Sequence, residues 1–471
     1  MIRTLSSQKF DWKSFIKQTL AIAIPVALQN LLSTTGSMID TMMIASLGEL
    51  NVAAVGLCGQ FSFLMFSCYW GFVGGGILFF SQYWGSKDYD GIERSYGLTL
   101  TCMMTISIIF AVLAAAFPNS VLKLFTDKKN IHEIGIKYIR IVGFAYPLQV
   151  LSVGMSSLLR STERVKIPLY AAIASVFTNT FCNWILIFGH FGAPAMGVEG
   201  AAIATLIAAF VNVLVIYVGA GITKYTHLFH FKNFFKWNKD FLTLYFKKCF
   251  PILCNELFLG IGHTLINIVL GHQVEEAIAA VAVFRTVEGL IIGFFAGFSS
   301  AASVLVGKCV GSGETKTAYE RAIRMVYFCQ LTILSVVILL FAFHSPLLHA
   351  MSLSGLSYKY GKYIIFIFGV ACIIRMGNWT QNDTYRSAGD ATFGTFLEII
   401  FMYSLVLPCV LLANYVFHSP FLLIFAFCYI DEPIRYFLMQ RHMYSGKWIK
   451  PVTPEGKKGL EDFLRESEQK N

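Results

Sequence analysis

The sequence predicts an all-α polytopic membrane protein with twelve transmembrane helices in two six-helix lobes, related by a parallel internal repeat. Hydrophobic residues make up 56% of the 471 residues and charged residues only 14%, against about 25% charged residues in soluble domains. Apolar stretches of about 20 residues, the length that crosses a bilayer, recur along the chain. The second half of the chain also repeats features of the first half at a fixed offset.

Each of the twelve apolar stretches is long enough to cross a membrane as a helix. A helix is expected in every case, because it satisfies its backbone hydrogen bonds internally in lipid. The alternation that a transmembrane barrel requires is not found. The predicted spans are 18–45, 53–80, 97–117, 138–159, 168–189, 200–222, 249–271, 278–306, 325–343, 363–384, 395–416 and 421–440.

Lys and Arg residues concentrate in alternate loops. The N-terminal arm and the loops after every second span carry 20 of them, whereas the opposite loops carry six. The positive-inside rule produces this asymmetry, so we predict a multi-pass protein of the plasma (inner) membrane with both termini in the cytoplasm. This topology and an attraction to anionic lipid account for the net charge of +10. No nucleic-acid partner is therefore expected.

Residues in the two halves match at an offset of 226. The matches that are hardest to obtain by chance are Pro25 with Pro251, Gly36 with Gly262, Gly85-Ser86 with Gly311-Ser312 and Arg160-Ser161 with Arg386-Ser387. They predict an N-terminal lobe at 1–225 and a C-terminal lobe at 226–445. Because each lobe has an even number of spans, both enter the membrane in the same direction. Transporters built in this way bind substrate where their repeats meet.

The joint between the lobes interleaves Lys with Phe, Trp and Tyr over 224–248. This composition favours a helix lying in the inner membrane surface over an irregular cytoplasmic linker. The segment 446–471 is polar, and we expect a cytoplasmic tail that frays. Within the joint, His227 and His230 have the spacing H-x-x-H. We interpret them as a surface pair, which we favour over a metal site.

No recognised catalytic motif is present. The chain lacks H-E-x-x-H, G-x-S-x-G and a Walker-type loop, so we expect a protein that is not an enzyme, with no catalytic residues and no cofactor. The 11 cysteines form no C-x-x-C pair and are interpreted as reduced residues. Without an ATP-binding motif, any transport would have to be driven by an ion gradient.

Ionisable side chains inside predicted spans are candidate functional residues, because placing them in lipid is costly. Arg285 and Glu288 are three residues apart, so they share a helix face and could neutralise each other. Asp431, Glu432 and Arg435 crowd the last span, where a structural cluster and a functional one are both open. The six groups that stand out are Asp40, Glu256, Arg285, Glu288, Arg375 and Glu398.

Asp40 differs from the others because no charged residue lies near it in the chain. Its partners must therefore come from other helices. Asn179 and Asn183 lie at i and i+4 on one helix face, and Thr205 lies in the next span. Together these residues offer a carboxylate, two amides and a hydroxyl, the hard oxygen donors that a small cation needs. A lone carboxylate in a low-dielectric setting can also take up a proton.

The chain resembles the multidrug and toxic compound extrusion (MATE) family of antiporters over about residues 10–445. The resemblance rests on the order of several segments, among them "IPVALQNLLSTTGSMIDTMMIASLG", "QYWGSKD", "LLRSTERVKIP", "TNTFCNWILIFG", "GVEGAAIATL", "PILCNELFLGIG" and "YRSAGDATFG". It implies a V-shaped, two-lobed transporter that exports amphipathic, cationic drugs or metabolites in exchange for protons or sodium ions. The expected partners are this small-molecule substrate and membrane lipid, and we expect a monomer.

The resemblance also implies roles for individual residues. The cation-coupling site of the first half falls on Asp40, Asn179, Asn183 and Thr205, and the only metal expected is a sodium ion at Asp40. Part of the family has Asp where this chain has Asn183, so the site keeps one carboxylate, which favours protons. Glu256 resembles an acid that the family places on its seventh helix. The residues proposed to bind substrate or a proton are Glu256, Arg285, Glu288 and Arg375.

Two other functions remain open at this point. A lipid-linked oligosaccharide flippase of the same superfamily would need buried cations for a polyprenyl phosphate, and Arg285 and Arg375 could serve. Against it, some of those flippases have more than twelve spans. A membrane-embedded enzyme or receptor is disfavoured by the missing catalytic motif and by the two matched halves.

Overall fold

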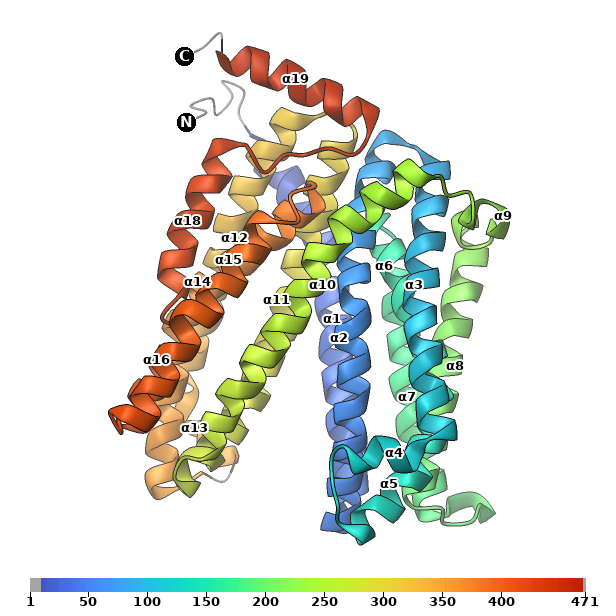
Figure 1. The fold of residues 1–471 in the computed structure, drawn as a ribbon, viewed down its shortest axis with the longest axis vertical. Helices are drawn as coiled ribbons and strands as arrows, with labels where there is room; N and C mark the ends of the chain where they lie inside the picture. The colour runs from blue at the N-terminus through green and yellow to red at the C-terminus, as the bar shows by residue number, and fades with distance from the viewer. Residues whose placement is uncertain (1–9, 352, 469–471) are drawn as a thin grey trace. The chain divides into compact units, whose positions relative to one another are not determined.

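The computed structural model describes residues 10–351 and 353–468, and this part of the chain is almost entirely helical (Figure 1). Within it, the only β-type pairing is an isolated bridge between Gly389 and Ile449. In chain order the helices are α1 (Trp12–Ala45), α2 (Glu49–Ser86), α3 (Tyr89–Ala116), α4 (Pro118–Lys123), α5 (Lys129–Val142), α6 (Ala145–Ser161), α7 (Lys166–Phe188), η1 (His190–Gly192), α8 (Val198–Ile222), η2 (Thr226–Leu228), α9 (Phe231–Phe234), α10 (Lys239–Gly271), α11 (Glu275–Gly311), α12 (Thr315–Ala342), α13 (His344–Ala350), α14 (Gly355–Ser387), α15 (Phe393–Phe401), the π-helical turn η3 (Met402–Val406), α16 (Leu407–Leu411), the π-helical turn η4 (Leu412–Val416), α17 (Phe421–Phe427), α18 (Glu432–Ser445) and α19 (Pro454–Glu468).

The lengths and compositions of these helices confirm a multi-pass membrane protein. Among the described residues, ten helices are long and apolar enough to cross a membrane, and eleven if α5 and α6, which meet at 50°, form one bent span. The twelfth predicted span falls on α17 and α18. These two helices are separated by a turn, and Pro433 in the first turn of α18 begins a new helix there.

The helix boundaries reproduce the internal repeat. The first residues of α3 and α12, Tyr89 and Thr315, are 226 positions apart, and so are their last residues. The pairs α1 with α10 and α2 with α11 differ in length by one residue each. The repeat is therefore confirmed along the chain, while the superposition of the two halves in space stays a prediction.

The two halves differ in where some of their helices break, and α14 is an example. The single helix α14 corresponds to both α5 and α6, because the first half has a break at Gly143. Pro147 explains the break, since it lacks an N–H and its ring would clash with the carbonyl four residues earlier, which is that of Gly143. The matching residue in the second half is Ile373, so α14 continues without interruption.

The described residues group into two compact units. The first-half unit contains residues 25–80 and 88–245, and the second-half unit contains 10–24, 81–87 and 246–468. Helices α1, α2 and α10 thus contribute residues to both. The predicted division at residue 225 concerns the repeat and stays a prediction. In the first-half unit, α4 and α5 lie at the end opposite α9 (Figure 1).

A close helix crossing within the second-half unit uses matching residues of the repeat. A Cβ atom added to Gly85 would lie 2.0 Å from the carbonyl oxygen of Lys308, and one added to Gly311 would lie 1.9 Å from that of Gln82. Gly85 and Gly311 correspond at the offset of 226, as do Gln82 and Lys308. The two matched glycines therefore let the backbones of α2 and α11 approach each other closely, each glycine lying against a carbonyl of the other helix.

The prediction of one helix over 224–248 is wrong, while the position of this linker at the inner membrane surface stays a prediction. The linker forms the short helices η2 and α9, and α10 begins at Lys239. The aromatic residues that suggested a helix divide between two environments: Phe234 is buried, whereas Phe231 and Phe235 are exposed. Phe234 packs against Tyr96 of α3 with ring centroids 5.2 Å apart, so tertiary contacts set the conformation of the linker.

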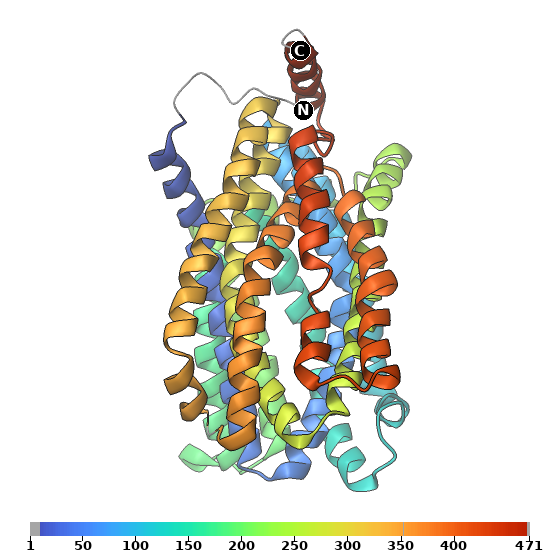
Figure 2. The ribbon, with the colours of Figure 1, turned by 90° about the vertical axis from the view of Figure 1, so that its left-hand side faces the viewer.

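The expectation that the tail frays is also wrong for its described part. Helix α19 forms and lies against α11 and α12, as Figures 1 and 2 show. Trp448 and Phe463 are buried, and the ring of Phe463 packs on that of Tyr319 at 5.8 Å. These two aromatic residues anchor an otherwise polar segment. The last three residues of the predicted tail, 469–471, lie outside the described residues.

Candidate functional site

In the first-half unit, Asp40 meets an amide of α7. The Asn183 Nδ2 atom donates a hydrogen bond of 2.6 Å to Asp40 Oδ1, and a second of 3.2 Å to Asn179 Oδ1. Asp40 lies one turn after Gly36, where an added Cβ would lie 3.1 Å from the Val176 side chain. The missing side chain at Gly36 thus lets α1 approach α7 closely enough for this contact.

Thr205 lies on α8, and its hydroxyl donates to the carbonyl of Ala201 on the same helix at 3.0 Å. No hydrogen bond joins it to Asp40 within the described residues. A residue that sequence reasoning missed lies near both: Tyr138 of α5 is buried, and its hydroxyl is close to Thr205 and to Asp40. The only sequence signal for Tyr138 was its place at the start of an apolar span.

One acceptor in this cluster lacks a donor. The Asn183 Oδ1 atom is buried and has no hydrogen-bond partner among the described residues. Leaving such an atom unpaired costs about 1–3 kcal/mol. A proton carried by a nearby group or a small cation would satisfy it. The arrangement therefore suits a carboxylate that gains and loses a positive ligand.

The second-half unit contains an ion-pair chain of alternating charge. Glu288 uses both oxygens: it accepts from Arg285 Nη1 at 2.6 Å and from Arg375 Nη1 at 3.0 Å. Arg375 also lies 3.8 Å from Glu432. The predicted pairing of Arg285 with Glu288 is therefore confirmed, but Arg375 of α14 shares the same carboxylate.

The ion-pair chain continues through α18 and back to α14. Arg435 contacts Glu432 at 2.8 Å and Glu398 at 3.7 Å. Arg386 then lies 3.8 Å from Glu398 and 3.5 Å from Glu256. The full order is Arg285, Glu288, Arg375, Glu432, Arg435, Glu398, Arg386 and Glu256.

Two further carboxylates branch from the ion-pair chain. Asp431 lies 3.4 Å from Arg435, and Asp383 lies 3.9 Å from Arg386. Six carboxylates thus face four guanidinium groups. Arginine stays protonated in proteins, so the fully ionised set would carry two net negative charges. Such an excess provides places for protons or for a cationic ligand.

The structure brings together all four residues predicted for the second half. Glu256, Arg285, Glu288 and Arg375 belong to one ion-pair chain supplied by α10, α11 and α14. Sequence reasoning left open whether Asp431, Glu432 and Arg435 form a structural or a functional cluster. The contacts show that Glu432 and Arg435 connect Arg375 to Glu398, with Asp431 as a branch. No periodicity could have shown this, because the residues come from separate helices.

Outside the spans, one carboxylate has a well-defined charge state. Asp390 lies in the loop after α14 and is 1% exposed. Burial acts to raise the pKa of Asp390, but hydrogen bonds from His442 Nε2 and Lys450 Nζ, both at 2.9 Å, outweigh it and hold the pKa well below its ordinary value. This loop is therefore fixed by an ionised carboxylate.

Repeated helical bundles with ionisable groups inside them define a membrane transporter. The family model described as MatE matches the chain twice, over residues 25–185 and 251–412. The chain belongs to this family of multidrug efflux transporters. The two matched segments begin 226 positions apart, which is the offset of the repeat.

Named relatives and solved structures agree with this assignment. The chain is 24% identical to the probable multidrug resistance protein YoeA of Bacillus subtilis over 410 residues, which is 86% of this chain and 88% of the relative. It is 22% identical to the multidrug resistance protein NorM of Vibrio cholerae over 310 residues, 65% of this chain and 67% of the relative. A crystal structure of the Vibrio cholerae MATE transporter VcmN matches with a TM-score of 0.81 at 16% identity, covering 93% of this chain and 99% of that one.

Proposed function

We propose that the protein is a secondary antiporter, not an enzyme, that exports amphipathic cationic compounds in exchange for protons or sodium ions. The observation that carries the proposal is the setting of Asp40. It is a carboxylate inside a helical bundle, held by an amide, and no described Lys, Arg or His forms an ion pair with it. A carboxylate without a fixed counter-ion is free to take an exchangeable one.

Exchange requires that ion binding change the relative free energies of two conformations of the protein. A proton on Asp40, or a sodium ion between Asp40 and the unpaired Asn183 Oδ1, would add contacts between α1 and α7. The conformation that holds these helices together would then bind the ion more tightly. By linkage, a substrate that favours the other conformation would compete with the ion. We favour protons, because Asn183 leaves the site a single negative charge.

The flippase alternative has less support. It required Arg285 and Arg375 to be available for a phosphate, and both donate to Glu288. The excess of carboxylates in the ion-pair chain favours a positively charged ligand. The relatives named above are also multidrug resistance proteins by name. The Lys and Arg distribution supports a plasma-membrane protein with cytoplasmic termini, and we propose this orientation together with a monomeric state.

The test is Asp40→Asn in the full chain, reconstituted in proteoliposomes, with proton and sodium gradients imposed separately. The variant should fold, because an Asn oxygen can still accept from Asn183. Export of a fluorescent organic cation should fall to the rate of protein-free liposomes, while binding of the cation persists. The matched control is Glu49→Gln, an exposed acid at the start of α2, which should export at the wild-type rate. Unchanged export by Asp40→Asn in both gradients would overturn the proposal.

A further inference from the structure

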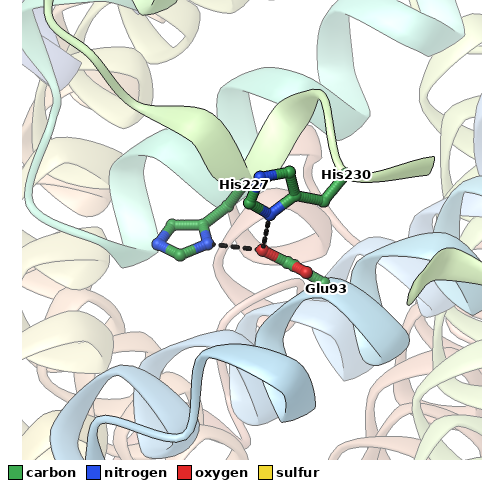
Figure 3. Close-up of side chains that lie close together, drawn as sticks. All are labelled: Glu93, His227 and His230. Carbon is green, nitrogen blue, oxygen red and sulfur yellow. Dashed lines mark hydrogen bonds and ion pairs between the residues drawn. The ribbon is translucent and has the colours of Figure 1, made fainter. Parts of the chain in front are cut away.

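A buried carboxylate at one end of the first-half unit collects two histidines from the linker. Glu93 of α3 has a side chain that is 3% exposed, and its Oε1 atom lies 2.8 Å from His227 Nδ1 and 2.7 Å from His230 Nδ1 (Figure 3). The predicted surface pair is thus wrong for His227, whose side chain is only 16% exposed. The transport mechanism proposed above uses none of these residues.

The backbone places the two histidines against α3. Gly97 lies one turn after Glu93 on the same helix face, and a Cβ atom there would lie 2.3 Å from the carbonyl oxygen of Phe234. Only glycine allows α9 to approach α3 this closely. His227 lies in the 3₁₀ turn η2 and His230 directly before α9, so both side chains reach Glu93.

Aromatic contacts fix the orientation of the imidazole at His227. Its ring stacks on Tyr89 at 5.0 Å and 17°, and meets the edge of Tyr225 at 5.1 Å and 79°. The rings of His227 and His230 are nearly perpendicular, at 88°. Their Nδ1 atoms therefore approach Glu93 from different directions, as ligands around a central ion do.

We propose that Glu93, His227 and His230 bind a divalent transition-metal ion, with Zn²⁺ the best match. Two imidazoles and one carboxylate are a donor set that suits zinc and not magnesium or calcium. The three ligand atoms lie within 4.8 Å of one another. Zinc bonds of about 2.0–2.1 Å in a tetrahedron place ligand atoms about 3.3 Å apart. The two histidine–glutamate separations, 2.8 and 2.7 Å, need to open by only about half an ångström, a change that small side-chain rotations supply.

The surroundings have the further features of a metal site. The Asn233 Nδ2 atom donates to the second oxygen of Glu93 at 2.6 Å, so it orients the carboxylate and leaves Oε1 for the ion. The His230 side chain is 51% exposed, which gives the ion a route from solvent and leaves room for water as a fourth ligand. Bound zinc would fasten the linker residues 226–234 to α3.

The test is direct zinc binding by the full-length protein, purified in detergent and stripped with EDTA. Titration with ZnCl₂ alone should show one ion per chain and protect the segment 224–238 from proteolysis. His230→Gln alters the most exposed of the three ligands, so the fold should persist, and zinc affinity should fall at least about 100-fold. Asn233→Ala should weaken binding by about 10–100-fold through loss of the carboxylate's orientation.

The matched control is His272→Gln, which alters an exposed histidine directly after α10 that bonds, among the described residues, only to the carbonyl of Ile268. Its zinc affinity should equal that of the wild type. Absence of stoichiometric zinc binding by the wild type would overturn the proposal. So would binding that His230→Gln leaves unchanged, because the zinc would then reside elsewhere.

Discussion

The two halves of the protein have matching helices but opposite site chemistry. The candidate coupling site of the first half has a single carboxylate, Asp40, bonded to an amide, and the second half holds an ion-pair chain of eight charged residues. At the offset of 226, Asp40 corresponds to Ile266 and Asn183 to Cys409. The second half therefore lacks the first-half site, although α10, α11 and α12 match α1, α2 and α3 in their bounds to within one residue.

A second comparison concerns Arg160 and Arg386, which occupy matching positions of the repeat. Arg386 pairs with Glu256, Asp383 and Glu398. Its counterpart Arg160 has no described carboxylate partner, because the residues that correspond to those three acids are Asn30, Ser157 and Ala172. The repeat thus conserves backbone geometry and leaves each half free to specialise. We infer that the first half handles the coupling ion and that the second half provides fixed charge.

The largest expected effect is on stability, from Arg386→Leu. Removing this guanidinium leaves three acids without their shared partner, so the free energy of unfolding should fall by about 3–5 kcal/mol. Arg160→Leu is the matched control and should cost less than about 1 kcal/mol, since no carboxylate loses a partner. Chemical unfolding in detergent measures both. Equal losses of unfolding free energy in the two variants would contradict a stabilising role for the ion pairs of Arg386.

The loops after α6 and α14 provide a second contrast. Asp390→Asn should lower the free energy of unfolding by about 2 kcal/mol at neutral pH, because it removes the charge that His442 and Lys450 bind. Arg164→Gln, at the matching position of the first half, should have an effect within about 0.5 kcal/mol.

The pH dependence of the wild type follows from the lowered pKa of Asp390. A carboxyl whose pKa is lower in the folded state stabilises the fold above its unfolded pKa of about 4, and this contribution is lost as the pH falls below that value. As the pH is lowered from about 5 toward the lowered folded-state pKa, the melting temperature should therefore fall more steeply in the wild type than in Asp390→Asn. Parallel profiles would contradict the assigned charge.

The next prediction concerns the ion preference of the first half. Asn183→Asp places a second carboxylate within hydrogen-bonding distance of Asp40, and two such groups repel unless they share a cation or a proton. Sodium affinity should rise about tenfold, a change of about 1.4 kcal/mol. Sodium-driven export in proteoliposomes measures it, with Asn212→Asp, an amide of α8 that bonds to Ser152, as the control. Identical sodium dependence in both variants would count against the site.

The smallest expected effect is that of Glu256→Gln in the second half. Arg386 would keep Asp383 and Glu398 as partners, so the fold should persist. If Glu256 contributes a proton or substrate contact, gradient-driven export should slow by about fivefold, the effect of a coupling free energy near 1 kcal/mol. Lys359→Gln, a change outside the ion-pair chain, serves as the control. Export at the wild-type rate by Glu256→Gln would remove this residue from the mechanism.

The sequence by itself determined the helical spans, the repeat and the pairing of Arg285 with Glu288. Each of these depends on apolar length, on periodicity or on residues three or four positions apart, and such signals are local. Asp40 could also be singled out, because an isolated carboxylate in an apolar stretch is costly wherever it lies. Asn183 could be singled out with Asn179 as amides on one helix face, but its contact with Asp40, 143 positions away, follows from no local pattern.

Only the tertiary structure decided which helix faces meet. Tyr138 of α5 lies beside the Asp40 site, and Arg375 reaches Glu288 across 87 positions of sequence. Glu93 is 134 positions from His227, and the approach of α9 to α3 depends on the absence of a side chain at Gly97. A periodic pattern predicts that a helix has a polar face, but packing against other helices determines what that face contacts. The site chemistry of this protein therefore arises from packing that local sequence does not encode.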